Sequence, residues 1–216
     1  MKKVAVVLSG CGVYDGSEIY ESVLTLLAIE QGGASYQCMA PNIDQMHVID
    51  HRSGEVMADQ QRNVLTEAAR LARGEILDLA EANPADYDAL IIPGGFGAAK
   101  NLSNFAVAGA AAVVNPDLIT FAQAIHAAGK PVGLICIAPT MTPLLFGDAL
   151  CTIGNDKEIA TAIETMGGQH QDCDCSSIVI DDTRKIVTTP AYMLAGSISE
   201  AAAGINKLVD KVLQLS

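Results

Sequence analysis

The stretch from Lys130 to Pro143, KPVGLICIAPTMTP, constrains the fold more than any other part of the chain. Its first part, Pro131 to Ile135, is a short apolar run after the turn signal Ala-Gly-Lys-Pro, which is typical of a fully buried strand. Cys136 follows at once, and Pro139 suits the first turn of a helix because its φ is fixed near the helical value. The sequence therefore predicts a thiol at a corner where a buried strand turns sharply into a helix.

A thiol at such a corner has two interpretations. Nucleophiles of hydrolase-type α/β folds occupy this position, since the turn lifts the side chain out of the sheet. A helix N-terminus aimed at Cys136 would lower the pKa of the thiol and offer free N–H groups to an oxyanion. The alternative is that Cys136 is one more small buried hydrophobe. Position and chemistry together favour the nucleophile.

Apolar runs and helical patterns alternate along the rest of the chain. We expect strands over Val4–Leu8, Tyr36–Ala40, Ile76–Leu79, Asp88–Ile92, Pro131–Ile135 and Cys151–Ile153, with hairpins over Met46–Met57 and Ile178–Thr188. We expect helices over Glu18–Gln31 (capped by Asp15 or Ser17), Asn63–Ala72, Asp117–Ala128, Thr140–Phe146, Ile159–Met166 and Ser197–Leu213.

This alternation predicts an α/β fold, a three-layer α/β/α sandwich with helices on both faces of a mostly parallel sheet. At 216 residues we expect a single domain, 1–216, with or without a small insertion. Ligands of such folds bind at the carboxyl ends of the strands. The loop after Leu8, the turn after Ile92 and Cys136 should therefore face one crevice.

Composition excludes several classes of partner. The formal net charge is −12, which argues against nucleic acid and anionic membrane surfaces as partners, because both require a basic face. No apolar run is long enough to span a bilayer, and MKKVAVVLSG is too short for a signal peptide. We therefore expect a cytoplasmic protein whose six cysteines are reduced.

Several motifs resemble one known family. GLICIAPTM and IIPGGFGAAKNLSNFA resemble the ThiJ/PfpI superfamily of class I glutamine-amidotransferase-like proteins. VVLSGCGVYDGSEIYESVLTLLAI and KIVTTPAYM resemble its ElbB-type glyoxalase branch, also called isoprenoid-biosynthesis or enhancing-lycopene-biosynthesis proteins. The resemblance covers essentially the whole chain. It implies a flavodoxin-like sheet with a nucleophile elbow, a glyoxalase (lyase) activity without cofactor, and a homodimer.

The glycine-rich turn Gly94-Gly95-Phe96-Gly97 brings backbone amides close to this thiol. With Cys136 nearby, the amides of Gly95, Phe96 and Ile137 are the natural oxyanion donors. The turn lacks the Walker A pattern and the dinucleotide glycine spacing, so we predict no nucleotide cofactor. A tight packing turn is the alternative interpretation.

The resemblance also implies a carboxyl group hydrogen-bonded to the thiol. Alignment on IYESV places Glu21 there, and Glu18 is the alternative because the loop before it blurs the register. From the residues alone, both would be ordinary glutamates in the first turn of a helix. A carboxyl buried beside a thiol should have a raised pKa and stay protonated. Tyr192 is a further pocket residue that the resemblance implies.

The histidines and the other cysteines give little support for a catalytic base or a metal site. None of the four histidines follows Cys136 closely, and His170, with Asp172, is predicted to lie on the surface of a connector. Cys11 is either a loop thiol or a thiol that resolves an oxidised Cys136. Cys173 and Cys175 lack zinc spacing, so we predict no metal.

Three functional hypotheses follow. The first is a glutathione-independent glyoxalase that converts glyoxal or methylglyoxal to a 2-hydroxy acid through a hemithioacetal on Cys136, with Glu21 relaying the proton. The second is a redox sensor or metabolite-binding protein that uses the same reactive thiol. The third, an amidase, is disfavoured because no histidine base is in place.

Overall fold

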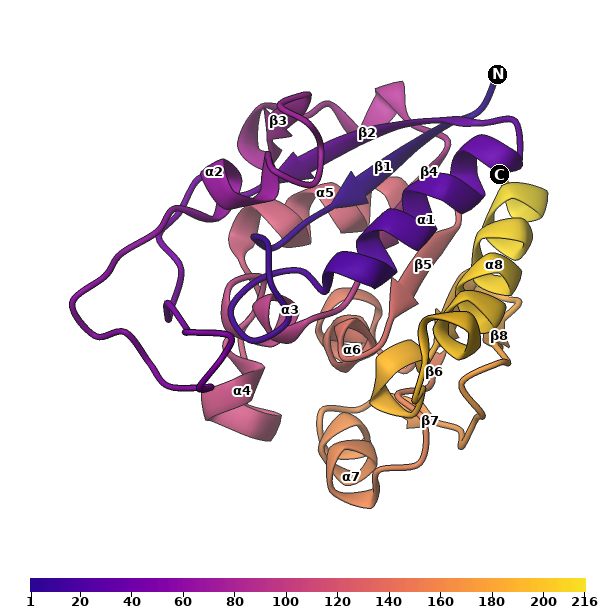
Figure 1. Ribbon diagram of the computed structural model, residues 1–216. Helices are drawn as coiled ribbons and strands as arrows, with labels where there is room; N and C mark the ends of the chain where they lie inside the picture. Colours follow the sequence, from indigo (N-terminus) through magenta and orange to yellow (C-terminus); the bar gives the residue numbers. More distant parts are fainter.

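A seven-stranded sheet forms the middle of the molecule, for which a computed structural model describes residues 1–216 (Figure 1). The strand order is β3-β2-β1-β4-β5-β9-β8, and every neighbouring pair is parallel except β8 and β9. The strands are β1 Lys3–Val7, β2 Ser35–Ala40, β3 Ile76–Asp78, β4 Ala89–Ile92, β5 Val132–Ile135, β8 Val179–Asp181 and β9 Ile186–Thr189. Without its edge strands β3 and β8, this sheet has the flavodoxin-like order.

Helices cover both faces of the sheet, so the predicted α/β/α sandwich is confirmed. They are α1 Ile19–Gln31, α2 Val64–Ala68, α3 Phe96–Lys100, α4 Phe105–Ala108, α5 Pro116–Ala127, α6 Thr142–Phe146, α7 Lys157–Thr165 and α8 Ile198–Leu215. α1 and α8 pack against each other on one face, and α5 lies on the opposite face (Figure 1). No helix is long and apolar enough to cross a membrane.

The alternation of side chains along β1 explains the two cores. Val4 and Val6 belong to the cluster that includes α1 and α8, whereas Ala5 and Val7 belong to the cluster that includes α5. Successive side chains of a strand point to opposite faces, so a strand buried on both faces reads as the continuous apolar run that the sequence contains.

Loops account for most differences from the predicted elements. The expected hairpin over Met46–Met57 has a single bridge, between Ile49 and Val56, and is otherwise irregular. Helix α2 ends before the predicted Ala72 because the chain continues in turns, with Arg73 at a φ of 54°. Short helices α3 and α4 were not predicted as elements, since each spans little more than one turn.

A small subdomain lies between β5 and β8, from Leu150 to His170. It consists of the parallel strands β6 (Leu150–Cys151) and β7 (Gln169–His170), with α7 between them. The strand β6 thus begins one residue before the predicted strand Cys151–Ile153 and ends two residues before it, and β7 was not predicted. Cys151, Ile153 and Ile163 form a buried cluster of their own. α7 projects from the body of the molecule beside β6 and β7 (Figure 1).

Candidate active site

Cys136 occupies a strained turn directly after β5. Its φ is 64°, a left-handed conformation that a side chain adopts at a cost, which is typical of a nucleophile elbow. The Cys136 amide donates to the Thr189 carbonyl at 2.9 Å, so the β5–β9 pairing extends to the corner itself. The chain then enters a 3₁₀ turn, Ala138–Met141, that runs into α6. The predicted strand–turn–helix corner is therefore present.

Two of the three predicted amide donors face the thiol. The amides of Gly95 and Ile137 lie beside the Cys136 thiol and act against the rise in its pKa that burial causes. The prediction for the Phe96 amide is wrong, since this N–H donates to the Val13 carbonyl at 2.8 Å. The loop after β1 folds over the glycine-rich turn, so the Phe96 N–H is bonded to this loop and does not serve an oxyanion. Phe96 instead contributes its half-exposed ring to the wall of the site.

Glu21 is the carboxyl group next to Cys136, and each of the two groups shifts the pKa of the other. Its side chain is completely buried, and its two oxygens accept from the amides of Gly94, at 2.9 Å, and Tyr192, at 3.1 Å. Gly94 lies so close that a Cβ at this position would collide with both the Cys136 Cβ and the Glu21 carboxylate. Only glycine allows the carboxyl and the thiol to meet there.

Glu18 lies in a different position from Glu21. The structure therefore distinguishes the two glutamates that the sequence left as alternatives for the carboxyl beside the thiol. It is the N-cap of α1, and its Oε2 accepts from the Glu21 amide at 2.7 Å. The caps expected from the sequence are wrong, because Asp15 accepts from the Ile49 amide and Ser17 from the Ser9 amide. The Glu18 carboxyl lines the open part of the site, whereas Glu21 lies behind Cys136.

Burial dominates the electrostatics of the pair. It raises the pKa of Glu21 to about 8, and the nearby Glu18 charge acts in the same direction. Burial, followed by the Glu21 charge, also raises the pKa of the Cys136 thiol well above its usual value. The lowered thiol pKa expected from the helix end is wrong, since desolvation outweighs the Gly95 and Ile137 amides. At neutral pH both groups are protonated, and the carboxyl is the more acidic of the two.

A cavity of about 280 Å³ opens above the thiol. Its lining residues, which define the Cys136 cavity, are Val13, Glu18, Gly95, Phe96, Cys136, Ile137, Ile159, Tyr192 and Met193. The predicted Tyr192 thus contributes to the site in two ways. Its amide donates to the Glu21 carboxyl, and its ring lines the cavity wall. Val13, Ile159 and Met193 were not predicted. Met193 follows Tyr192 directly, whereas no sequence signal marks Ile159.

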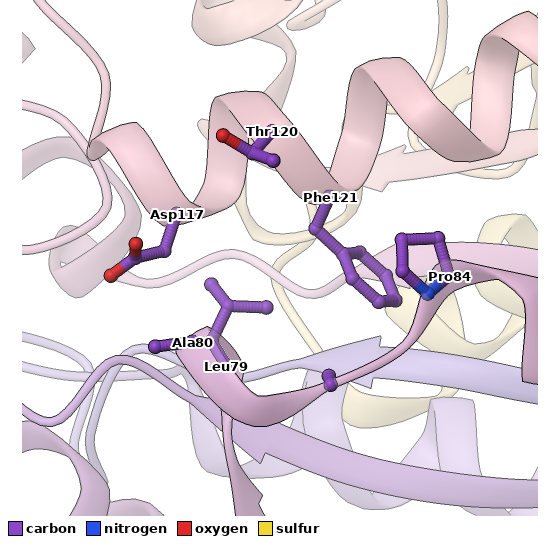
Figure 2. Close-up of a pocket in the computed structure, with 7 residues that line it drawn as sticks. Leu79, Ala80, Pro84, Asp117, Thr120 and Phe121 are labelled. Carbon is purple, nitrogen blue, oxygen red and sulfur yellow. The ribbon is translucent and has the colours of Figure 1, made fainter.

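A second depression lies elsewhere, between α5 and the segment that runs from Leu79 to Pro84. It measures about 100 Å³, and Asp117, Thr120 and Phe121 form one wall (Figure 2). Figure 2 shows the Phe121 ring beside Pro84, with Asp117 further along the same helix. Asp117 is the only ionisable group on its wall, and the Thr120 hydroxyl donates to the Pro116 carbonyl at 2.9 Å with no base beside it. This depression therefore lacks the groups that acid–base or covalent chemistry requires.

The remaining residues weighed in the sequence lie outside the Cys136 cavity. The prediction that His170 is a surface residue is wrong, because its side chain is 3% exposed. Its Nε2 accepts from the Ile153 amide at 3.3 Å, so it stabilises the small subdomain. Cys11 lies near Glu67 and Arg70 rather than on the cavity wall. No three metal-binding side chains are grouped anywhere in the chain.

Comparison with known proteins identifies a family. Residues 2–145 match the model of the DJ-1/PfpI family. The human glutamine amidotransferase-like class 1 domain-containing protein 3, mitochondrial, is 45% identical over 99% of this chain and 83% of its own length. The zebrafish ES1 protein, mitochondrial, is 32% identical over 88% of this chain and 76% of its own length.

A solved structure extends the similarity to the whole fold. The Ehrlichia chaffeensis isoprenoid biosynthesis protein with amidotransferase-like domain has a TM-score of 0.93 at 35% identity, over 100% of this chain and 99% of the other. Drosophila melanogaster DJ-1beta shares the fold at a TM-score of 0.57 and 16% identity, over 99% of this chain and 95% of the other.

Proposed function

The chain belongs to the DJ-1/PfpI family, and on that premise we propose that it is a glutathione- and cofactor-independent glyoxalase. The substrate is a small dicarbonyl such as glyoxal or methylglyoxal, and the product is a 2-hydroxy acid. The observation that carries the proposal is the Cys136 thiol on the wall of an open cavity, with the buried Glu21 carboxyl next to it and the Gly95 and Ile137 amides beside the sulfur. Covalent chemistry on an aldehyde needs these groups and no histidine or metal.

The first step forms a bond between sulfur and carbon. The reactive form of the pair is the one in which Glu21 has lost its proton. Ionised Glu21 accepts the thiol proton as the Cys136 sulfur adds to the aldehyde carbon, while the Gly95 and Ile137 amides stabilise the charge that develops on the aldehyde oxygen. The same proton then passes from Glu21 to that oxygen, which gives a hemithioacetal and leaves Glu21 ionised for the next step. A carboxyl with a pKa of about 8 suits this relay, because near neutral pH it takes up and releases a proton readily.

The second step moves hydrogen between the two substrate carbons. Ionised Glu21 takes the proton from the hemithioacetal carbon and returns it to the neighbouring carbon, so the first carbon is oxidised and the second reduced. Water then hydrolyses the resulting thioester and releases the thiol. For glyoxal the sum is glyoxal plus water to glycolic acid. Glu18 is the other carboxyl that could carry this proton, since its side chain lines the cavity.

The redox-sensor hypothesis is less well supported by the same geometry. Sensor cysteines are exposed and have a low pKa. Cys136 is 7% exposed, and burial raises the pKa of its thiol. An uncharged, sheltered thiol that deprotonates only when a substrate accepts its electrons favours catalysis over spontaneous oxidation.

The test is steady-state turnover of glyoxal and methylglyoxal without glutathione or metal. Wild type should show a kcat within the ordinary range of roughly 1–1,000 per second. Cys136→Ala should lose activity, and Glu21→Gln should fall by about 10²–10⁴-fold to a low residual rate. Glu18→Gln, which keeps a cap acceptor, should stay within about tenfold if Glu21 carries both protons. Wild-type-like turnover by Cys136→Ala would end the proposal, and selective peroxide oxidation of Cys136 without turnover would favour the redox sensor.

Location and assembly remain part of the proposal. We place the protein in the cytoplasm as a homodimer, on the grounds of its acidic composition and of the resemblance to its family. Two similar proteins, from human and zebrafish, carry the word mitochondrial in their names. Cell fractionation against cytoplasmic and mitochondrial markers tests the location directly, and recovery with the mitochondrial marker would overturn it.

A further inference from the structure

We infer that Cys173 and Cys175 form a reversible disulfide by exchange with a low-molecular-weight disulfide such as oxidised glutathione. This redox site is separate from Cys136 and from the chemistry proposed there. Closure of the bond loosens the contact between α7 and the segment that carries the two cysteines, so the small subdomain responds to the redox state of its surroundings.

The first observation is the exposure of the two thiols. Three of the six cysteines are buried, and the half-buried ones are Cys11, Cys173 and Cys175. Cys11 lies beside Glu67 and Arg70. Cys173 and Cys175 instead lie together in the connection from β7 to the edge strand β8 (Figure 1), and Cys173 lines an open polar depression there. A dissolved disulfide can therefore reach this pair, as exchange requires.

The second observation is the short distance that the bond must span. Cα atoms two positions apart lie at most about 7 Å from each other even in an extended chain, and disulfides usually join Cα atoms about 4.4–6.8 Å apart. The Cys173 thiol donates to the Asp174 carbonyl at 3.4 Å, so it already points towards the peptide group that precedes Cys175. Burial, followed by the charges of Asp174 and Cys175, raises the pKa of the Cys173 thiol, which agrees with this proximity.

The exchange has two steps. The thiolate of one cysteine attacks oxidised glutathione, which forms a mixed disulfide and releases one reduced glutathione. The thiolate of the other cysteine then attacks the protein sulfur of the mixed disulfide, closes the bond and releases the second glutathione. The pair loses two electrons and two protons, and one glutathione disulfide becomes two thiols. A ring across so few residues is strained, and strained disulfides are readily reduced, so excess reduced glutathione reverses the reaction.

The end of the segment at Cys175 is firmly held. The Cys175 carbonyl lies against Gly204 of α8 so closely that a Cβ at that position would collide with it. The next two carbonyls of the chain accept from the Lys207 ammonium and from the Thr189 hydroxyl, each at 2.7 Å. Cys175 therefore keeps its position when the ring closes, and Cys173 is the residue that moves.

The end at Cys173 is held by weaker contacts that lead to α7. The Cys173 amide donates to the Gly154 carbonyl, in the loop before α7, at 3.2 Å. Asp172 pairs with Lys157, the first residue of α7, at 2.8 Å. Both side chains of this ion pair are more than half exposed, and exposed pairs contribute little to stability. Movement of Cys173 therefore breaks these contacts and loosens α7, which forms part of the wall of the Cys136 cavity.

The experiment equilibrates the protein with mixtures of reduced and oxidised glutathione and maps the thiols by mass spectrometry. In wild type and in the control Cys11→Ser, the peptide that contains Cys173 and Cys175 should lose two hydrogens, and dithiothreitol should restore them. Cys173→Ser and Cys175→Ser should instead retain one glutathione on the remaining thiol. In oxidised wild type, amide hydrogen exchange of α7 should be at least about fivefold faster, because a hydrogen bond and an ion pair are lost, whereas Cys173→Ser treated alike should show no such rise.

The outcomes test the disulfide and its effect on α7 separately. A mixed disulfide in wild type that never closes, or a bond from either thiol to a different cysteine, would overturn the pair. Closure of the ring without faster exchange in α7 would overturn the link to the small subdomain. None of these measurements uses glyoxal turnover, so failure of this site and failure of the proposed function are distinguishable.

Discussion

At the scale of single residues, the site depends on proton transfer between two buried groups. Glu21 and Cys136 are both shielded from solvent, and burial disfavours the charged form of each. The two backbone amides on Glu21 and the two on Cys136 reduce this penalty without removing it. The pair is therefore mostly protonated at neutral pH, and its reactive form is the one in which Glu21 has lost its proton and can accept that of the thiol.

Activity should rise with pH as the pair loses its first proton. The pKa of Glu21 is raised to about 8, so the rise of kcat/KM in wild type should be centred near that pH. In Glu21→Gln only the thiol can lose a proton, and burial raises its pKa well above the usual value, so the rise should move to higher pH. pH profiles of kcat/KM test this, with Glu164→Gln as the control, and an unchanged midpoint in Glu21→Gln would contradict the role of the carboxyl.

Stability should also depend on this proton. The folded-state pKa of Glu21, about 8, lies above the unfolded value of about 4.3, so between these pH values the folded chain binds one proton more. The free energy of unfolding should therefore fall as pH rises through this window, by up to about 1.4 kcal/mol per pH unit more in wild type than in Glu21→Gln. Urea titrations between these pH values measure the difference in slope, and parallel curves would contradict the raised pKa.

At the scale of elements, the site depends on how closely three strand ends approach. The turn after β4 lies between α1 and the elbow after β5, and a Cβ on Gly94 would collide with side chains of both. The ends of β1, β4 and β5 can therefore approach closely enough to form the site only because Gly94, in the turn after β4, has no side chain. The crossover order of the sheet brings these ends together, as is general at the switch point of such folds.

Gly94→Ala should therefore separate the thiol from its carboxyl. The added methyl group overpacks the site, which typically costs about 1–3 kcal/mol of stability, and we expect activity to fall at least ~100-fold. Gly196→Ala is the matched control, since the nearest atom to its added Cβ would be 3.6 Å away. Thermal melts and glyoxal turnover measure both effects. Near-normal activity in Gly94→Ala would show that the contact of Glu21 with Cys136 is not needed.

The sequence predicts elements far better than the contacts of their loops. Buried strands such as β1 and β5 were predicted because an apolar run bounded by turn signals has few other stable structures. The hydrogen bond from the Phe96 amide to the Val13 carbonyl was not predictable, since it depends on how the loop after β1 folds back. The same holds for His170, whose burial depends on pairing between β6 and β7, two strands of two residues each. Long patterns carry local information, whereas short strands form only in tertiary context.

At the scale of the whole molecule, one surface remains without a partner. α1 exposes Ile19, Tyr20, Val23 and Leu27, each between 42% and 50% exposed. Residues 19, 23 and 27 are spaced four apart and therefore form one stripe along the helix. On a chain with a formal charge of −12, copies repel one another unless an apolar surface offsets the repulsion. This stripe is the surface that we assign to the proposed homodimer.

Substitution within the stripe tests that assembly. Val23→Lys should shift the protein from dimer to monomer in sedimentation analysis, because burial of an unpaired charge at an apolar contact is costly. Val107→Lys is the control, since Val107 is also exposed but lies on α4. A wild-type protein that sediments as a monomer would contradict the homodimer. A Val23→Lys variant that remains dimeric would place the contact elsewhere.

The most direct measurement of the central claim is mass spectrometry of the protein quenched during turnover of a dicarbonyl. We expect a covalent adduct on the peptide that contains Cys136, partly in a form that hydroxylamine cleaves, as a thioester requires. The adduct should be absent from Cys136→Ala, and it should disappear as the 2-hydroxy acid forms. Steady turnover without any adduct on Cys136, or with the adduct confined to other cysteines, would contradict the assignment of this thiol as the nucleophile.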